Sequence, residues 1–331
     1  MRNFRARDLR IGGAIFAGAL LAISAALARA AQSQSAATPH AAESPQATRT
    51  VVDETGRRIV LPMEVRRVVS LAPNLTETIY ALGAESRLVG DTDFCDVPAA
   101  AKLKPHVGTP LSPSLEAIVG LKPDLVLATT AINRRTTVDG LERLGVPVYT
   151  TDPHSVEGLL AGIEHLAGVI GIPQPGRDLA ASLRSRLDAL NKALAGEPRC
   201  RALFVVWEDP LTSIGQNTFI ADALKFAGAE SVVDTPQDWP RVSLEAVVHM
   251  QPEVLIFARD HGDMNPDLAD LRRRAGWRDL DAVKRGHVAV ISSEVDRPAP
   301  GLIDAIENLA TQLHPSAFDK SATGSAHACS R

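Results

Sequence analysis

One sequence unit occurs twice in this chain, and this duplication constrains the fold more than any other feature. The segment SLEAIVGLKPDLVL (114–127) returns 129 residues later as SLEAVVHMQPEVLI (243–256). Each copy reads as a capping serine, a short helix with an apolar face, a proline–acid turn and an apolar strand. Solenoid repeats recur every roughly 20 to 50 residues, so one distant repeat predicts two similar α/β lobes instead. A cleft between lobes is a common site for a small ligand.

Strands alternate with helices in both halves of the chain, which predicts parallel sheets covered by helices. A hairpin at 51–60 precedes the first half, and Asn74 or Thr76 is expected to cap a helix in which Glu77 suits the positive end of the helix dipole. Further helices are expected at 114–121, 134–144, 219–227, 268–274 and 302–313. Besides the strands of the two repeats, strands are expected at 68–71, from Val89, and at 146–149, 202–206 and 288–291.

A long helix is expected between the two halves. Leucines recur at helical spacing from Asp178 to Ala195, Pro175 suits the start of the helix, and Gly196 ends it. About twenty residues give roughly 30 Å of helix, a stiff link. The predicted organisation is an N-terminal lobe at 49–154, linking helices at 155–197, a C-terminal lobe at 198–315 and a disordered tail at 316–331.

The N-terminus has the pattern of a secretory signal peptide. Four arginines precede an apolar run from Ile11 to Leu27, and Ala28-Arg29-Ala30 supplies a small-x-small cleavage site. A membrane anchor is the alternative, because the run approaches spanning length, but its small residues and the cleavage site favour cleavage after about Ala30. A flexible leader is expected at 31–48, followed by a mature protein in the periplasm.

Composition and motifs argue against several function classes. The formal net charge of −4 does not suit a nucleic-acid binder. Nucleophile-elbow, zinc-protease, P-loop and dinucleotide-binding motifs are all missing from the sequence, and its nine histidines lack the spacing of metal ligands. Three cysteines, Cys95, Cys200 and Cys329, leave at least one thiol unpaired within the chain. We therefore expect a binding protein without a catalytic residue, metal or cofactor.

Aromatic residues are scarce, so their positions are informative. Trp207 follows a predicted strand, where α/β folds bind ligands, Phe94 lies in a polar loop, and Trp239 precedes the second repeat. They are either core anchors or a flat apolar wall for a ligand. The matched acids Glu116 and Glu245 either stabilise their helix dipoles or dock a two-fold partner through its arginines.

Several motifs in order resemble the helical-backbone substrate-binding proteins of ABC importers, which carry cobalamin, iron-siderophores or haem. They are RVVSLAPNLTE (67–77), DFCDVP (93–98), both repeats, the linking helix and Trp239-Pro240, and the resemblance covers residues 50 to 315. It implies two α/β lobes with parallel-rich sheets, one long rigid helix between them and a ligand cleft. The chain most resembles the cobalamin-binding branch.

The resemblance also assigns roles to residues. Phe94, Trp207 and Trp239 match or lie close to aromatic cleft positions of the family, and Glu294 and Arg297 fall near polar cleft residues that meet the corrin amides. Glu116 and Glu245 match acids that meet arginines on the dimeric permease. The chain departs from the branch at Thr109-Pro110-Leu111, which stands in place of a cleft tryptophan. It also departs from those relatives that have a bridging cysteine pair in the second lobe, for which no counterpart is identified.

The expected protein is thus a monomeric periplasmic receptor that binds a corrinoid, with cobalamin as transported ligand, and delivers it to an ABC importer. A ferric siderophore or haem is the alternative ligand, for which Arg134-Arg135 could serve an anionic chelate. Two rivals belong to different classes of protein. One is an exported chelatase-type enzyme, which would need a nucleophile or a convergent base in the cleft; none is found in the sequence, and replacing His106 and His154 would test this class. The second is a sensor that reports to a membrane partner.

Overall fold

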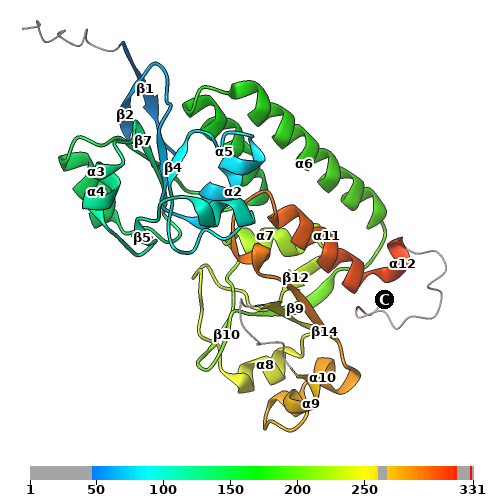
Figure 1. Cartoon of the computed structure of the whole chain (residues 1–331). Coiled ribbons are helices and arrows are strands. Elements are labelled where there is room, and N and C mark those ends of the chain that lie inside the picture. Colours follow the sequence, from blue (N-terminus) through cyan, green and yellow to red (C-terminus); the bar gives the residue numbers. More distant parts are fainter. Residues whose placement is uncertain (1–46, 260–266, 319–328, 330–331) are drawn as a thin grey trace, which may run out of the picture. The chain divides into compact units, whose positions relative to one another are not determined.

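Each half of the chain folds around a four-stranded parallel sheet. The computed structural model describes residues 47–259, 267–318 and 329. The first sheet has the order β4-β3-β7-β8 and the second the order β12-β9-β13-β14, so the strands of both follow the same pattern along the chain (Figure 1). The strands of the first sheet are β3 (Val68–Ser70), β4 (Leu88–Gly90), β7 (Leu125–Thr129) and β8 (Val148–Thr151). Those of the second are β9 (Cys200–Val205), β12 (Ala229–Ser231), β13 (Val254–Arg259) and β14 (Val288–Ser292).

We call each sheet with its own helices and hairpins a lobe. The N-terminal lobe contains the hairpins β1 (Thr48–Val52)–β2 (Arg58–Pro62) and β5 (Gly108–Thr109)–β6 (Ser112–Pro113), the helices α2 (Pro73–Ala81), α3 (Leu115–Gly120) and α4 (Arg135–Arg143), and the 3-10 helix η1 (Ala99–Leu103). The C-terminal lobe contains the hairpin β10 (Trp207–Glu208)–β11 (Leu211–Thr212) and the helices α7 (Phe219–Phe226), α8 (Leu244–Met250), α9 (Leu268–Leu271), α10 (Asp281–Arg285), α11 (Leu302–Leu313) and α12 (Pro315–Phe318). Two 3-10 helices, η2 (Trp277–Asp279) and η3 (Ser293–Asp296), complete it.

Two helices connect the lobes. The expected long helix is α6 (Pro173–Ala193), whose 21 residues span about 31 Å. Helix α5 (Val156–Val169) packs along it, and the two lie side by side in Figure 1. The sequence predicts the long helix because its leucines repeat over about four turns, and the structure confirms it.

Side chains alternate between the two faces of each strand, so the core is divided into separate clusters on the two faces of each sheet. Val69 and Val126 face a cluster beneath α3 and α4, and Leu203 and Leu255 face the corresponding cluster beneath α8 and α10. The opposite strand faces, with α2, α5, α6, α7 and α11, share one continuous core that includes residues of both lobes. This shared core, rather than the connecting chain alone, joins the lobes.

The duplication extends to side-chain contacts. Arg67 donates from Nη2 to the carbonyl of Leu121 at the end of α3, at 2.6 Å, while the carboxylate of Asp124 accepts its backbone amide at 2.8 Å. In the other lobe, Arg201 donates to Met250 at 2.7 Å, and Glu253 accepts the Arg201 amide at 2.9 Å. The repeated helix–turn–strand unit is therefore anchored to the first strand of its sheet in the same way twice.

Local details differ from the sequence-based expectations. Neither Asn74 nor Thr76 caps α2; the cap position is Ala72, which makes no side-chain cap, because the helix starts at Pro73. Strand β8 begins at Val148 rather than 146. The cap of α2 lies two residues before Asn74 and four before Thr76, and the start of β8 shifts by two residues.

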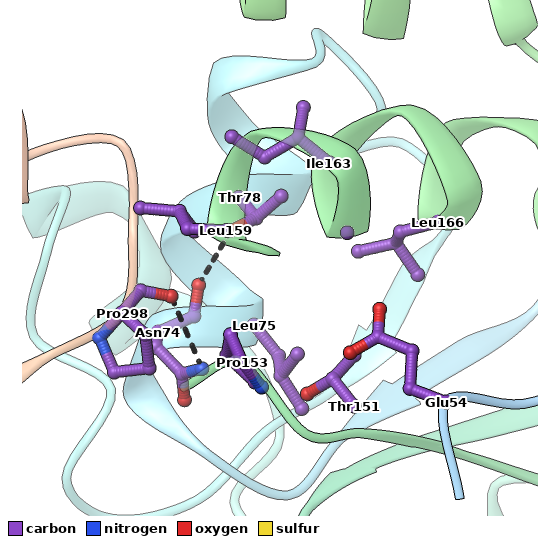
Figure 2. A pocket seen from close by; sticks show the side chains of 11 residues that line it. Glu54, Asn74, Leu75, Thr78, Thr151, Pro153, Leu159, Ile163, Leu166 and Pro298 are labelled. Carbon is purple, nitrogen blue, oxygen red and sulfur yellow. Dashed lines mark hydrogen bonds between the residues drawn. The ribbon is translucent and has the colours of Figure 1, made fainter. Parts of the chain in front are cut away.

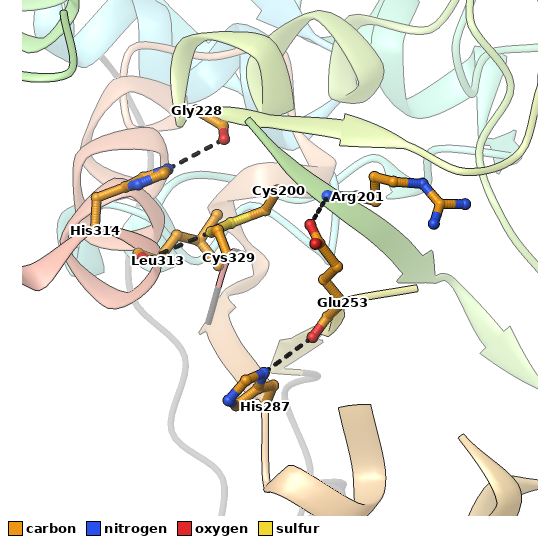
Figure 3. The surroundings of a disulfide bond; sticks show 8 residues. All are labelled: Cys200, Arg201, Gly228, Glu253, His287, Leu313, His314 and Cys329. Carbon is orange, nitrogen blue, oxygen red and sulfur yellow. Dashed lines mark hydrogen bonds between the residues drawn. A yellow bond between two sulfur atoms is a disulfide. The ribbon is translucent and has the colours of Figure 1, made fainter. Parts of the chain in front are cut away.

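The C-terminus is bound to the lobe at two places. Helix α12 and Cys329 are described, and a disulfide joins Cys329 to Cys200 at the start of β9 (Figure 3). The expectation of a disordered tail at 316–331 is therefore wrong for these residues, since the disulfide and the helix order them. Cys329 also supplies a bridge in the second lobe, where the sequence alone indicated no counterpart. Residues 319–328 and 330–331, like the signal peptide and leader to residue 46, lie outside the described residues. In the described ranges, no helix is both long enough and apolar enough to cross a bilayer.

Candidate ligand-binding site

The loop that follows β4 presents Phe94 to solvent. Its side chain is 59% exposed, whereas the next residue, Cys95, is buried. The Cys95 thiol lies 3.2 Å from the hydroxyls of both Thr76 and Thr92, which fixes the loop onto α2. Burial raises the pKa of this thiol, so Cys95 is a structural and unreactive residue. The buried cysteine holds Phe94 outward.

Trp207 and Trp239 are carried by adjoining segments of the C-terminal lobe. Trp207 lies in β10 and pairs with Thr212, and Thr212 in turn forms a bridge with Arg241, two residues after Trp239. The tryptophans are 52% and 47% exposed. Of the two interpretations of these aromatics, a core role is excluded for all three, because a core aromatic is buried. Large apolar side chains left this exposed favour a contact surface for a ligand or partner.

Glu294 and Arg297 lie together around η3, the turn that leads into α11. Both are half-buried. Glu294 accepts a hydrogen bond from Ser292 Oγ at 2.7 Å, and Arg297 lies 3.5 Å from Asp96 in the Phe94 loop. The structure thus brings Arg297 of one lobe to the loop that carries Phe94 of the other.

Of two hollows in the structure, only one is lined by a predicted site residue. A pocket of about 280 Å³, including its opening to solvent, lies between α2, α5 and the segment at Pro298 and contains none of the predicted site residues (Figure 2). A wider hollow of about 720 Å³ is lined by Glu294, together with Arg259, Asp304 and Gln312. Phe94, Trp207 and Trp239 line neither of these two hollows and are exposed to solvent.

Glu116 and Glu245 occupy equivalent positions in the two lobes. Each is the acid in the first turn of its helix, α3 or α8, behind a capping serine whose Oγ accepts a hydrogen bond at 3.1 Å. Both glutamates are exposed, and within the described residues neither takes part in an ion pair. Their carboxylates are therefore available to a partner.

The hairpin β5–β6 contains Thr109-Pro110-Leu111, which stands in place of a cleft tryptophan of the cobalamin-binding branch. Leu111 is exposed at its tip. The amide of the buried Asn133 donates 2.9 Å bonds to the carbonyls of Pro110 and Leu71, and its oxygen accepts the amide of Thr129 at 2.8 Å. Asn133 was not expected from the sequence, because a lone asparagine in a loop carries no motif.

The histidines considered as catalytic bases have ordinary surroundings. His106 pairs with Asp91 at 2.8 Å, and the exposed His154 lies 3.2 Å from Asp152. Among the described residues, one group could bring three metal-ligand atoms together, Cys200, His314 and Cys329, and its two sulfurs are consumed by the disulfide (Figure 3). His314 bonds to the carbonyl of Gly228 at 3.1 Å.

Comparison with known proteins supports what this geometry suggests. A family model described as periplasmic binding protein matches residues 68–295. The chain belongs to the periplasmic binding protein family. The vitamin B12-binding protein of Vibrio campbellii is 31% identical over 244 residues, which cover 73% of this chain and 86% of that protein.

Solved periplasmic binding proteins share the fold. The periplasmic vitamin B12 binding protein BtuF of Vibrio cholerae superposes with a TM-score of 0.67 at 27% identity, over 77% of this chain and 99% of that one. The haem-binding protein RhuT from Roseiflexus gives a TM-score of 0.68 at 25% identity, over 76% and 99%. The family and the two-lobe α/β architecture predicted from the sequence are therefore confirmed.

Proposed function

We propose that this protein is a periplasmic receptor that binds a corrinoid, with cobalamin as the main candidate. The ligand would lie between Phe94 of the N-terminal lobe and Trp207 and Trp239 of the C-terminal lobe. The receptor then delivers the ligand to an ABC importer. Apolar contact with the flat corrin face supplies affinity, and Glu294 and Arg297 bond to polar groups at the ligand's edge. Binding and release involve no chemical step. The signal peptide would direct export across the inner membrane and be cleaved after about Ala30.

The observation that carries this proposal is the exposure of these three aromatics in a chain with few of them. Each lies in a segment after the carboxyl end of a parallel strand, where open α/β sheets bind ligands. The vitamin B12-binding relative at 31% identity supports the corrinoid over other ligands.

Titration of the purified mature protein with cyanocobalamin, followed by tryptophan fluorescence, tests the proposal. We expect one-to-one binding, and about tenfold weaker binding for Trp207→Ala or Trp239→Ala, since one stacked aromatic contributes roughly 1–2 kcal/mol. Phe318→Ala removes an exposed aromatic of α12 and serves as the matched control. Wild-type affinity in both tryptophan variants would contradict the proposed site.

Haem is the second candidate ligand. It is favoured by the exposed aliphatic Leu111 at the β5–β6 tip and by the structural similarity to a haem-binding protein at 25% identity. Titration with haemin beside cyanocobalamin distinguishes the two. Tight binding of haemin without binding of cyanocobalamin would keep the receptor function and change its ligand.

Docking to the importer is assigned to Glu116 and Glu245. Exposed carboxylates at equivalent places on two lobes, without an ion pair to any described residue, suit arginines of a two-fold permease. The double variant Glu116→Ala/Glu245→Ala should lose ligand delivery in an uptake assay and keep ligand affinity. Glu85→Ala/Glu230→Ala removes one exposed acid from each lobe and is the control. Loss of affinity in the first double variant would place these acids at the ligand.

A further inference from the structure

Helix α11 lacks a cap of its own. Its cap position is Gly301, which has no side chain, and the first-turn amides of Leu302 and Ile303 bond to the backbone carbonyls of Ala299 and Pro300. Asp304, three residues after Gly301, could accept the Gly301 amide in the manner of a capping box, but it pairs with Arg186 of α6 instead. The Gly301 amide is therefore left for an acceptor from elsewhere in the chain.

The missing cap comes from the other lobe. Glu77 of α2 accepts the Gly301 amide on Oε1 at 2.7 Å. The side chain reaches across from the N-terminal lobe, although the sequence suggested that it stabilises the dipole of its own helix. It is only 8% exposed, and in the part of the chain that the structure describes its Oε2 has no hydrogen-bond partner. Burial raises its pKa, and the nearby Glu294 adds to the shift.

Two further contacts hold the same segment. Asn74, one turn before Glu77, donates from Nδ2 to the carbonyl of Pro298 at 3.5 Å, as Figure 2 shows beside the pocket. Asp96 approaches Arg297 at 3.5 Å. Three residues of the segment 297–301, Arg297, Pro298 and Gly301, are thus held by the N-terminal lobe, and this segment begins three residues after Glu294.

The position of Gly301 shows how closely the carboxylate fits. A Cβ built on Gly301 would lie 2.8 Å from Glu77 Oε1 and 3.4 Å from Glu294 Cδ. The backbone of Gly301 is helical, with φ −63° and ψ −17°, so alanine would be tolerated there without strain. A glycine at this place serves to admit the glutamate of the other lobe.

We propose that Glu77 is a positioning residue for the ligand site: by capping α11 from the opposite lobe it sets where Glu294 and Arg297 stand relative to the Phe94 loop. The inference rests on the proposed function, because it concerns the same site. It predicts that a change at a residue that does not touch the ligand weakens ligand binding, and that the carboxylate can be replaced by any group that keeps the acceptor oxygen.

Four variants test this inference. Glu77→Ala removes the cap, and Gly301→Ala displaces the carboxylate without strain in the backbone. Glu77→Gln keeps an acceptor oxygen, so its hydrogen exchange and its ligand affinity should both stay near those of the wild type. Asp222→Ala is the matched control, since Asp222 of α7 accepts the Val156 amide at the start of α5 at 2.9 Å and so also caps a helix distant in sequence, away from the proposed site.

Two measurements are made on each variant. In the ligand-free protein, hydrogen exchange of residues 294–304 should become about tenfold faster in Glu77→Ala and Gly301→Ala, and stay near wild type in Glu77→Gln and Asp222→Ala. Cyanocobalamin binding, or haemin binding if the protein takes haemin, should weaken about tenfold in the first two variants only.

The outcomes separate this inference from the proposed function. Unchanged exchange in both Glu77→Ala and Gly301→Ala overturns the cap itself. Faster exchange with unchanged affinity overturns the positioning role. If the wild-type protein binds neither cyanocobalamin nor haemin, the proposed function is wrong. Hydrogen exchange of residues 294–297 in the ligand-free protein then still decides whether Glu77 positions this segment.

Discussion

At the scale of single residues, Asp91 of the N-terminal lobe has a pKa far above its ordinary value. Its side chain is fully buried at the end of β4, and Oδ1 lies 2.8 Å from His106 Nδ1. Within the described residues Oδ2 has no hydrogen-bond partner. Burial raises the pKa of Asp91 to about 6, although His106 acts in the opposite direction. The folded protein therefore holds a proton on Asp91 at pH values where the unfolded chain has lost it.

The free energy of unfolding should consequently depend on pH through this residue. A raised pKa in the folded state stabilises the protein below about pH 4, and this contribution is lost as the pH rises through about 6. Asp91→Asn should remove that step, so the variant gains roughly 1–3 kcal/mol relative to wild type between pH 4 and pH 8. Urea unfolding at several pH values measures the difference. Asp188→Asn, at an exposed position of α6, is the control, and parallel pH profiles for wild type and Asp91→Asn would contradict the prediction.

At the scale of elements, the helices and strands of the repeated unit were predicted best from the sequence. The capping serines, apolar helix faces and apolar strands of α3–β7 and α8–β13 are local patterns, so their positions could be inferred from the residues alone. The end of α6 and the bounds of α11 were predictable for the same reason. The hairpins β5–β6 and β10–β11 were not expected, since strands of two residues carry no periodic pattern.

Part of the candidate site was predictable in the same way. The exposed aromatics could be found because aromatic residues are rare in this chain and stand after predicted strands. The buried residues that hold neighbouring segments in place could not be found: Cys95, Asn133 and Glu77 act through contacts with residues distant in the sequence. Single polar residues have no spacing from which such contacts follow.

Asn133 provides a test at this scale, because one side chain connects β3, β7 and the β5–β6 hairpin. Asn133→Ala leaves two carbonyls and one amide without their partner in a buried place, which should cost about 1–3 kcal/mol of unfolding free energy. Proteolysis at the hairpin should also accelerate. Urea unfolding and limited proteolysis measure the two effects, with the exposed Asn191→Ala of α6 as a control expected within about 0.5 kcal/mol of wild type. A stable variant with an equally resistant hairpin would contradict the role given to Asn133.

At the scale of the whole molecule, the disulfide closes the C-terminal lobe over a long stretch of chain. Cys200 and Cys329 are 129 residues apart, and both are buried. The pairing could not be deduced from the sequence, since three cysteines allow three single bridges. The repeat nevertheless predicted the larger plan of two similar α/β lobes, and the structure adds that both sheets have the same strand order.

Opening the disulfide should lower the free energy of unfolding by roughly 2–4 kcal/mol, because it frees the unfolded chain from a long closed loop. Urea unfolding with and without dithiothreitol measures this loss. Cys200→Ala should lose the same amount and show no further effect of the reductant. Thiol titration in denaturant should find one thiol, Cys95, in the oxidised protein and three after reduction. Equal stability of the oxidised and reduced proteins would contradict the prediction.

The shared core has a consequence for how the protein unfolds. Helices α2, α5, α6, α7 and α11 and the inner faces of both sheets bury their apolar residues in one cluster. Half of the chain on its own would leave its side of that cluster open to water, at a cost of about 25 cal/mol for each Å² of apolar surface. Neither lobe is therefore expected to fold alone, and the two lobes should unfold together in one transition.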